Sequence, residues 1–111
     1  MTSREDIPAI RRLNDELRQH GRGGRMLMTR GIEALGLAAL GEILRAVAAF
    51  KEFSEDNDPH GEHDFGALRV GDSRIFWKID YYDKSLEAAS PDPTDPDLTV
   101  RVMTIMLAEE Y

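Results

Sequence analysis

Apolar residues recur at helical spacing in two stretches of the chain. Ile10, Leu13 and Leu17 lie three or four positions apart, and Gly21 follows them as a natural helix C-cap. The spacing predicts a helix over residues 6–20. A second and wider apolar stripe predicts a helix over residues 37–53 that packs flat against a sheet.

Three other segments have the composition of strands. Residues 26–29 form a short apolar run, and residues 65–70 and 74–82 flank a Gly-Asp pair that is typical of a hairpin turn. Alternation along the third segment predicts that one set of side chains meets the core, namely Ile75, Trp77, Ile79 and Tyr81.

The C-terminal segment, residues 98–107, is rich in Val, Thr and Ile, which favours a strand. Its apolar positions also fit a helix, so both assignments stay open. The segments 54–63 and 83–97 are polar, and the second contains three prolines, which predicts loops.

The resulting order is α-β-α-β-β-β. It predicts an α+β fold in which a mostly antiparallel four-stranded sheet is packed by two helices on one face. A chain of 111 residues has room for one core, so we expect a single domain over residues 1–111.

Charge is distributed unevenly along the chain. The net charge is −7, and residues 52–111 alone contain fifteen acidic and five basic side chains. This excess of carboxylates argues against nucleic acid as a partner. The absence of cysteine excludes thiolate chemistry. No apolar run is long enough to span a membrane, and the charges near the start of the chain do not fit a signal peptide. We therefore expect a cytoplasmic protein.

The densest chemistry lies in residues 57–66, NDPHGEHDFG. Two histidines and three acidic residues alternate there, and His60, His63 and Asp64 together could bind a divalent metal. Glu62 could then serve as a general base on a bound water. The sequence has no H-E-x-x-H signature, and Asp58-Pro59-His60-Gly61 is equally typical of a structural β-turn.

A second group of polar residues ends the hairpin, at positions 80–83. If the two hairpin strands pair, Asp80 and Tyr82 should approach His63 and Asp64. Asp80 is then a second candidate catalytic residue, and Tyr82 joins His60, His63 and Asp64 as a candidate binding residue. The alternative is that Asp80 and Lys78 form a surface ion pair without catalytic function.

Several segments together resemble one family of small bacterial proteins that is known as a domain of unknown function. The family is common in α-proteobacteria and is often found on plasmids and other mobile elements. The resemblance implies a standalone domain and brings no assigned activity. It rests on residues 57–66, 76–83 (FWKIDYYD), 90–97, 101–111 and 10–36.

Three functional hypotheses follow. The first is a small acidic interaction or regulatory protein whose carboxylates attract a basic protein partner; the resemblance implies that it serves a mobile element. The second is a metal-binding protein or metal-dependent hydrolase that uses the HGEHD turn. The third is a toxin-like ribonuclease, which rests on the layout of the elements alone and fits the acidic sheet half poorly.

Overall fold

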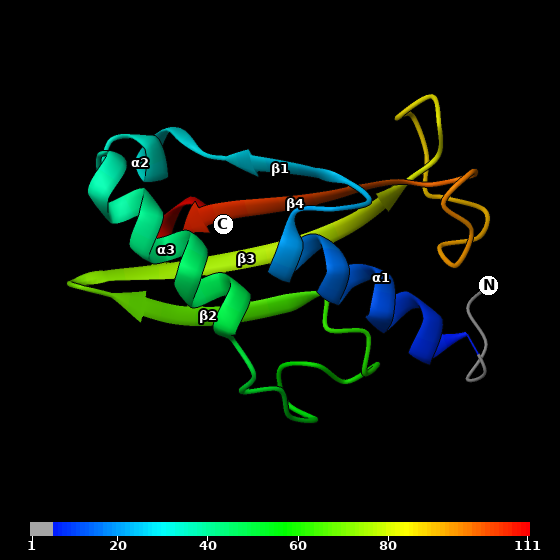
Figure 1. The fold of residues 1–111 in the computed structure, drawn as a ribbon, viewed down its shortest axis with the longest axis horizontal. Helices are drawn as coiled ribbons and strands as arrows, with labels where there is room; N and C mark the ends of the chain where they lie inside the picture. Colours follow the sequence, from blue (N-terminus) through cyan, green and yellow to red (C-terminus); the bar gives the residue numbers. More distant parts are fainter. Residues whose placement is uncertain (1–5) are drawn as a thin grey trace.

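The computed structural model describes residues 6–111, which form one sheet and the helices that accompany it (Figure 1). The first half contains the three α-helices and one strand, and the second half contains the other three strands and a 3₁₀-helix. The elements are α1 (Ile7–His20), β1 (Arg25–Met28), α2 (Arg30–Glu33), α3 (Leu37–Ala49), β2 (Phe65–Val70), β3 (Ser73–Tyr82), β4 (Val100–Leu107) and the 3₁₀-helix η1 (Ala108–Glu110).

The four strands form one mixed sheet in the order β1-β4-β3-β2. The α+β class and the strand at the C-terminal end are thereby confirmed. The β2–β3 and β3–β4 pairs are antiparallel, but β1 runs parallel to β4. The prediction of a mostly antiparallel sheet therefore holds for two of the three pairings. The parallel pair arises because β1 reaches its partner through a long connection rather than a hairpin.

The first helix agrees with its prediction. Gly21 ends α1 in the left-handed conformation at φ 69°; its N–H donates to the Leu17 carbonyl, and the N–H of Arg22 donates to the Glu16 carbonyl. This conformation carries no steric penalty for glycine, which explains why the helix ends there.

The second helix is shorter than predicted, and the sequence did not predict the short helix α2. Helix α3 ends at Ala49, and Phe50 is already extended. The cause lies outside the helix: the Arg18 guanidinium of α1 donates to the carbonyls of Val47, Ala48 and Phe50, and so caps the helix end. The four-residue α2 has too few residues to show a periodic pattern.

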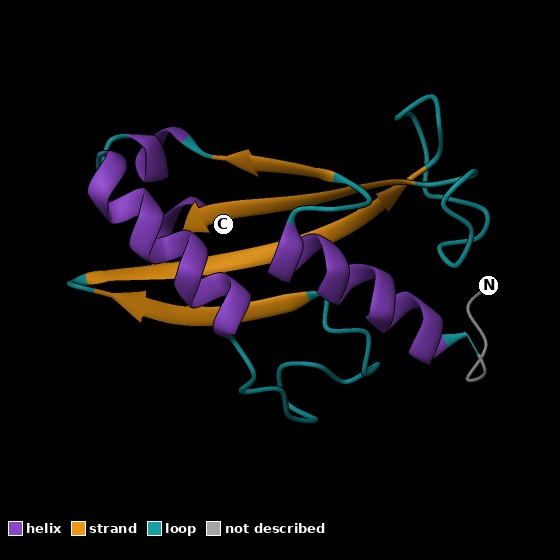
Figure 2. Ribbon diagram, viewed as in Figure 1, coloured by secondary structure: helices purple, strands orange, loops and turns teal. Residues whose placement is uncertain are grey.

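All three α-helices lie on one face of the sheet (Figure 2). Ile32, Ile43 and Val47 are fully buried with Trp77 of β3 in one apolar core. As expected from alternation, Ile75 and Ile79 share this core, and the half-buried Tyr81 packs against it. The helices thus cover the side of the sheet that the sequence assigned to the core.

The other face of the sheet carries none of these helices, and we call it the open face. Strand register and alternation assign its residues. They are Arg25 and Leu27 of β1; Val100, Val102, Thr104 and Met106 of β4; Arg74, Phe76, Lys78, Asp80 and Tyr82 of β3; and Phe65, Ala67 and Arg69 of β2.

In the part of the chain that the structure describes, no helix combines the length and the apolar character needed to cross a membrane.

Candidate functional site

The HGEHD turn is held against helix α1. The N–H of Gly61 donates to the carbonyl of Asp58 at 3.1 Å, which closes the β-turn expected from Asp58-Pro59-His60-Gly61. From α1, Arg11 Nε donates to the Gly61 carbonyl at 2.6 Å, and Asn14 Nδ2 donates to the Glu62 carbonyl at 3.0 Å. The turn is therefore fixed by side chains that precede it by about fifty residues.

Both the ring and the backbone N–H of His63 have partners among the described residues. Its ring stacks on Phe53 with centroids 3.7 Å apart, and its Nδ1 lies 3.0 Å from Asp15 Oδ1. Its backbone N–H donates to Asp58 Oδ1 at 3.2 Å, and Nε2 lies 3.9 Å from Asp58 Oδ2. The imidazole thus bridges two carboxylates, which is a structural role.

Glu62 belongs to a buried polar network. Its Oε1 accepts a hydrogen bond from the Tyr81 hydroxyl at 2.7 Å, and that hydroxyl accepts one from Asn14 Nδ2 at 2.8 Å. Asn14 Oδ1 in turn accepts from Arg101 Nε at 2.7 Å. Arg101 is only 2% exposed, and its guanidinium lies 5.0 Å from the centroid of the Tyr81 ring.

Electrostatics in this network follow from burial. Desolvation, helped by the hydrogen bond to Glu62, raises the pKa of Tyr81, and desolvation lowers the pKa of Arg101. With Tyr81 neutral and Arg101 charged at neutral pH, the Glu62 carboxylate and the Arg101 guanidinium compensate each other through Asn14 and Tyr81. Glu62 therefore has a structural role in this network.

A preformed metal site is not found at the turn. His60 is exposed, whereas His63 is held by Asp15 and Asp58. Burial, followed by the nearby charge of Glu62, raises the pKa of Asp64 and so disfavours its ionised form. Within residues 6–111, no three His, Cys, Asp or Glu side chains are grouped so that they could hold a metal ion. The structure therefore shows no arranged set of ligands for the metal site predicted at His60, His63 and Asp64.

The predicted convergence on the hairpin end holds for the backbone only. The Ile79 N–H donates to the Asp64 carbonyl at 2.8 Å, so the two strand ends do meet. Asp80 and Tyr82, however, lie on the open face, whereas Tyr81 reaches the turn on the helix face. Alternation along β3 separates them from His63. Asp80 pairs with Lys78 at 2.9 Å, and its catalytic role stays a prediction that nothing tests.

The open face has a charge opposite to that of the whole chain, and sequence analysis missed it. Its strand positions carry four basic side chains and one acidic side chain: Arg25, Arg69, Arg74 and Lys78, with Asp80. Charge counted by segment hides this surface because residues 52–111, which contain β2, β3 and β4, also contain acidic loops. Counting every second strand position would have found it.

Aromatic side chains cover one end of the open face. The ring centroids of Phe65 and Phe76 are 5.3 Å apart, and Tyr111 lies 6.1 Å from the first and 5.6 Å from the second. Tyr111 is 74% exposed. We call these three residues the aromatic cluster.

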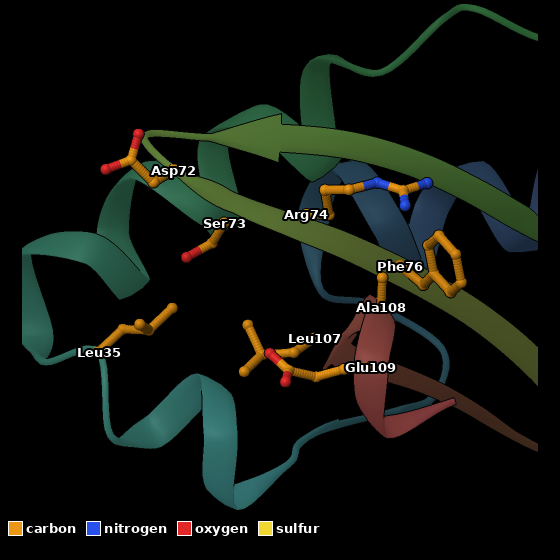
Figure 3. Close-up of a pocket in the computed structure, with 8 residues that line it drawn as sticks. All are labelled: Leu35, Asp72, Ser73, Arg74, Phe76, Leu107, Ala108 and Glu109. Atoms are coloured by element: carbon orange, nitrogen blue, oxygen red, sulfur yellow. The ribbon is translucent and has the colours of Figure 1, made fainter.

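Two hollows adjoin the open face. A hollow of about 580 Å³ lies where β3 begins and β4 ends, and Figure 3 shows Leu35, Arg74 and Leu107 among its walls. We call it the hairpin-end hollow; Phe76, Asp72, Ser73, Ala108 and Glu109 complete it. A second hollow of about 330 Å³, the β1-side pocket, is lined by Arg25, Leu27, Lys78, Asp80, Tyr82, Leu86, Val102 and Thr104.

These features describe a small α+β protein whose conspicuous polar motifs hold the fold together and whose sheet has one open face. Residues 28–110 match a family described as "Protein of unknown function (DUF3768)". The match covers most of the chain, so the protein belongs to this family, and the resemblance to a domain of unknown function is confirmed over residues 28–110. Neither the curated proteins nor the solved structures yield a match to the chain.

Proposed function

We propose that this protein is an interaction module that binds an acidic segment of a protein partner through the open face of its sheet, in the cytoplasm. The observation that supports the proposal most is the pair formed by Arg69 and Arg74. These two residues are directly opposite each other on β2 and β3, and both are exposed.

Like charges at directly opposite positions of a sheet destabilise it by up to about 1 kcal/mol. Within residues 6–111, neither guanidinium has a carboxylate within 4.0 Å, and the one hydrogen bond of Arg69 goes to the Asp72 carbonyl. The chain thus carries an unneutralised cationic pair although it is rich in acidic residues. A carboxylate of a partner would relieve the repulsion, and two guanidinium groups suit it well.

Apolar contact is available beside the two arginines. The aromatic cluster lies on the same face, and Arg74 and Phe76 also line the hairpin-end hollow. Two carboxylates, Asp72 and Glu109, share the walls of that hollow. The partner residue that enters it should therefore be apolar, with the acidic residues of the partner placed over the arginines.

This proposal keeps the hypothesis of an interaction protein but replaces the expected basic partner with an acidic one. Nucleic acid also carries the negative charge that the arginines require, but with a phosphate at every nucleotide it is repelled by the net charge of −7 more strongly than a protein segment with a few carboxylates. No observation favours the metal-dependent hydrolase over this proposal.

Comparative affinity capture tests the proposal. The bait is the full chain, used as wild type, as Arg69→Ser/Arg74→Ser, and as the control Arg12→Ser/Arg45→Ser, which removes two exposed arginines from the helix side. We expect a protein that is retained by the wild type and the control, is lost with the first variant, and is released by salt. The same difference, at least about tenfold in Kd, should appear with the purified partner.

Three results would overturn the proposal. The first is a partner that all three baits retain equally. The second is a partner that is released by Arg12→Ser/Arg45→Ser alone. The third is recovery of nucleic acid in place of protein by the wild-type bait, checked with a labelled single-stranded oligonucleotide.

A further inference from the structure

We infer that the β1-side pocket is a binding site for a small organic anion, that is, a carboxylate or phosphate group attached to a ring or another apolar body. This inference goes beyond the proposed function. The pocket lies near the β1 edge of the open face and contains neither of the two arginines assigned to the protein partner nor any residue of the aromatic cluster.

The positive charge in the pocket comes from two strands. Arg25 of β1 is exposed, and no carboxylate among residues 6–111 lies within 4.0 Å of its guanidinium. Lys78 of β3 is paired with Asp80, and the hydrogen bond that its ammonium group donates to that carboxylate raises the pKa of the lysine, which keeps it charged. Two cations with one carboxylate leave room for one more negative charge.

Groups that would orient a ligand lie beside these charges. Thr104 and Tyr82 add hydroxyl groups to the lining. In the part of the chain that is described, neither hydroxyl has a hydrogen-bonding partner within the protein. They are free to bind the polar part of an anion.

The apolar part of the pocket is formed by Leu27, Leu86 and Val102. Leu27 and Leu86 are about half exposed, at 53% and 45%, so apolar surface is available to a ligand. Leu86 also has a φ of 63°, which is unusual for a leucine. Such backbone strain tends to occur at binding sites.

Size supports a small organic ligand. The volume of about 330 Å³ lies within the range of roughly 300–1,000 Å³ that small-molecule sites occupy. An inorganic ion alone would leave the leucine side chains in water. A ligand with a ring and one anionic group would use both halves of the pocket.

Titration of ¹⁵N-labelled full-length protein tests this inference. The probes are adenosine 5′-monophosphate, benzoate, inorganic phosphate and uncharged adenosine, all at millimolar concentrations. We expect saturable shifts of the Leu27, Val102 and Thr104 amide signals with at least one organic anion, and weaker binding of inorganic phosphate and adenosine. The first two probes distinguish a phosphate from a carboxylate ligand.

Variants separate this site from the protein-binding surface. Arg25→Ser should weaken the bound organic anion at least about tenfold, whereas Arg69→Ser/Arg74→Ser should leave it unchanged. Leu86→Ala should weaken the organic anion and leave inorganic phosphate unchanged. The inference fails if neither organic anion gives saturable shifts at these amides, or if Arg25→Ser binds as the wild type does. Loss of protein capture with Arg69→Ser/Arg74→Ser would not affect it.

Discussion

Replacing Tyr81 by phenylalanine tests how much the buried polar network contributes to stability while the packing of the ring is kept. The substitution removes one oxygen and keeps the ring over which Arg101 lies. That oxygen donates to Glu62 Oε1 and accepts from Asn14 Nδ2. The side chain of Asn14 is fully buried, so one of its two amide hydrogens would be left without a partner.

The expected cost follows from these bonds. A buried donor left unsatisfied costs about 1–3 kcal/mol, and this cost dominates because water can replace the charge-assisted hydrogen bond that the only partly buried Glu62 carboxylate loses. We therefore expect Tyr81→Phe to lower the free energy of unfolding by about 1–3 kcal/mol. In a domain of this size, 1 kcal/mol corresponds to a Tm change of about 4–8 °C.

The neighbouring Tyr82 provides a matched control. It lies on the open face, and its hydroxyl makes no hydrogen bond with any other residue in the range 6–111. Tyr82→Phe should therefore change stability by less than about 0.5 kcal/mol. Urea unfolding followed by the fluorescence of Trp77, the one tryptophan, reports both variants, provided their m-values agree.

A double-mutant cycle adds a direct measure of the coupling. Asn14→Ala and Tyr81→Phe should be less than additive because both remove the same hydrogen bond. Equal losses for the Tyr81 and Tyr82 variants, or strict additivity in the cycle, would refute the reasoning that the network carries this stability.

Three smaller perturbations test other parts of the fold by the same urea assay. Gly41→Ala should raise stability by about 0.5–1 kcal/mol, because the added Cβ would lie 3.5 Å from Arg45 Nη1, an ordinary contact, inside a helix. Gly66→Ala should lower it by about 1–3 kcal/mol, since the Cβ would enter the indole of Trp77. Asp64→Asn should raise stability at pH 7. Burial raises the pKa of this carboxyl, so the folded protein loses stability as pH rises from 3.8 through the folded pKa. The gain in stability of Asp64→Asn should vanish below pH 3.8. A gain in stability that becomes larger as the pH falls would contradict this reasoning.

The local elements could be predicted from sequence where a periodic pattern was long enough. Helix α1, the hairpin and the core face of β3 all had such patterns. The end of α3 could not be predicted, because a side chain from α1 sets it. The parallel pairing of β1 with β4 likewise depends on contacts between segments about 77 residues apart, as in the pair of Arg25 with Val102.

The candidate site shows the same limit. The sequence placed chemistry at Glu62 and His63 because acids and histidines are dense there. Their partners, Tyr81 and Asp15, come from other elements and give these side chains structural roles. The open face was not predicted because its four cations are spread over three strands, and only the sheet brings them onto one surface.

Helix α1 lies outside the segment that matches the family, yet it supplies residues that the matched segment needs. Asn14 holds Glu62, Tyr81 and Arg101 together, and Arg18 caps α3. A fragment of residues 25–111 should therefore fail to fold into a stable structure.

The magnitude supports this expectation. The fragment loses Ile10 and Leu17, both fully buried, at about 1.5–3 kcal/mol each, and leaves the buried Arg101 charge without its contact to Asn14. These losses approach the 5–15 kcal/mol by which whole domains are stable. Near-UV circular dichroism and amide signal dispersion measure the result. A fragment that unfolds cooperatively at the same urea midpoint as the full chain would show that α1 is dispensable and that the matched segment holds its polar motifs alone.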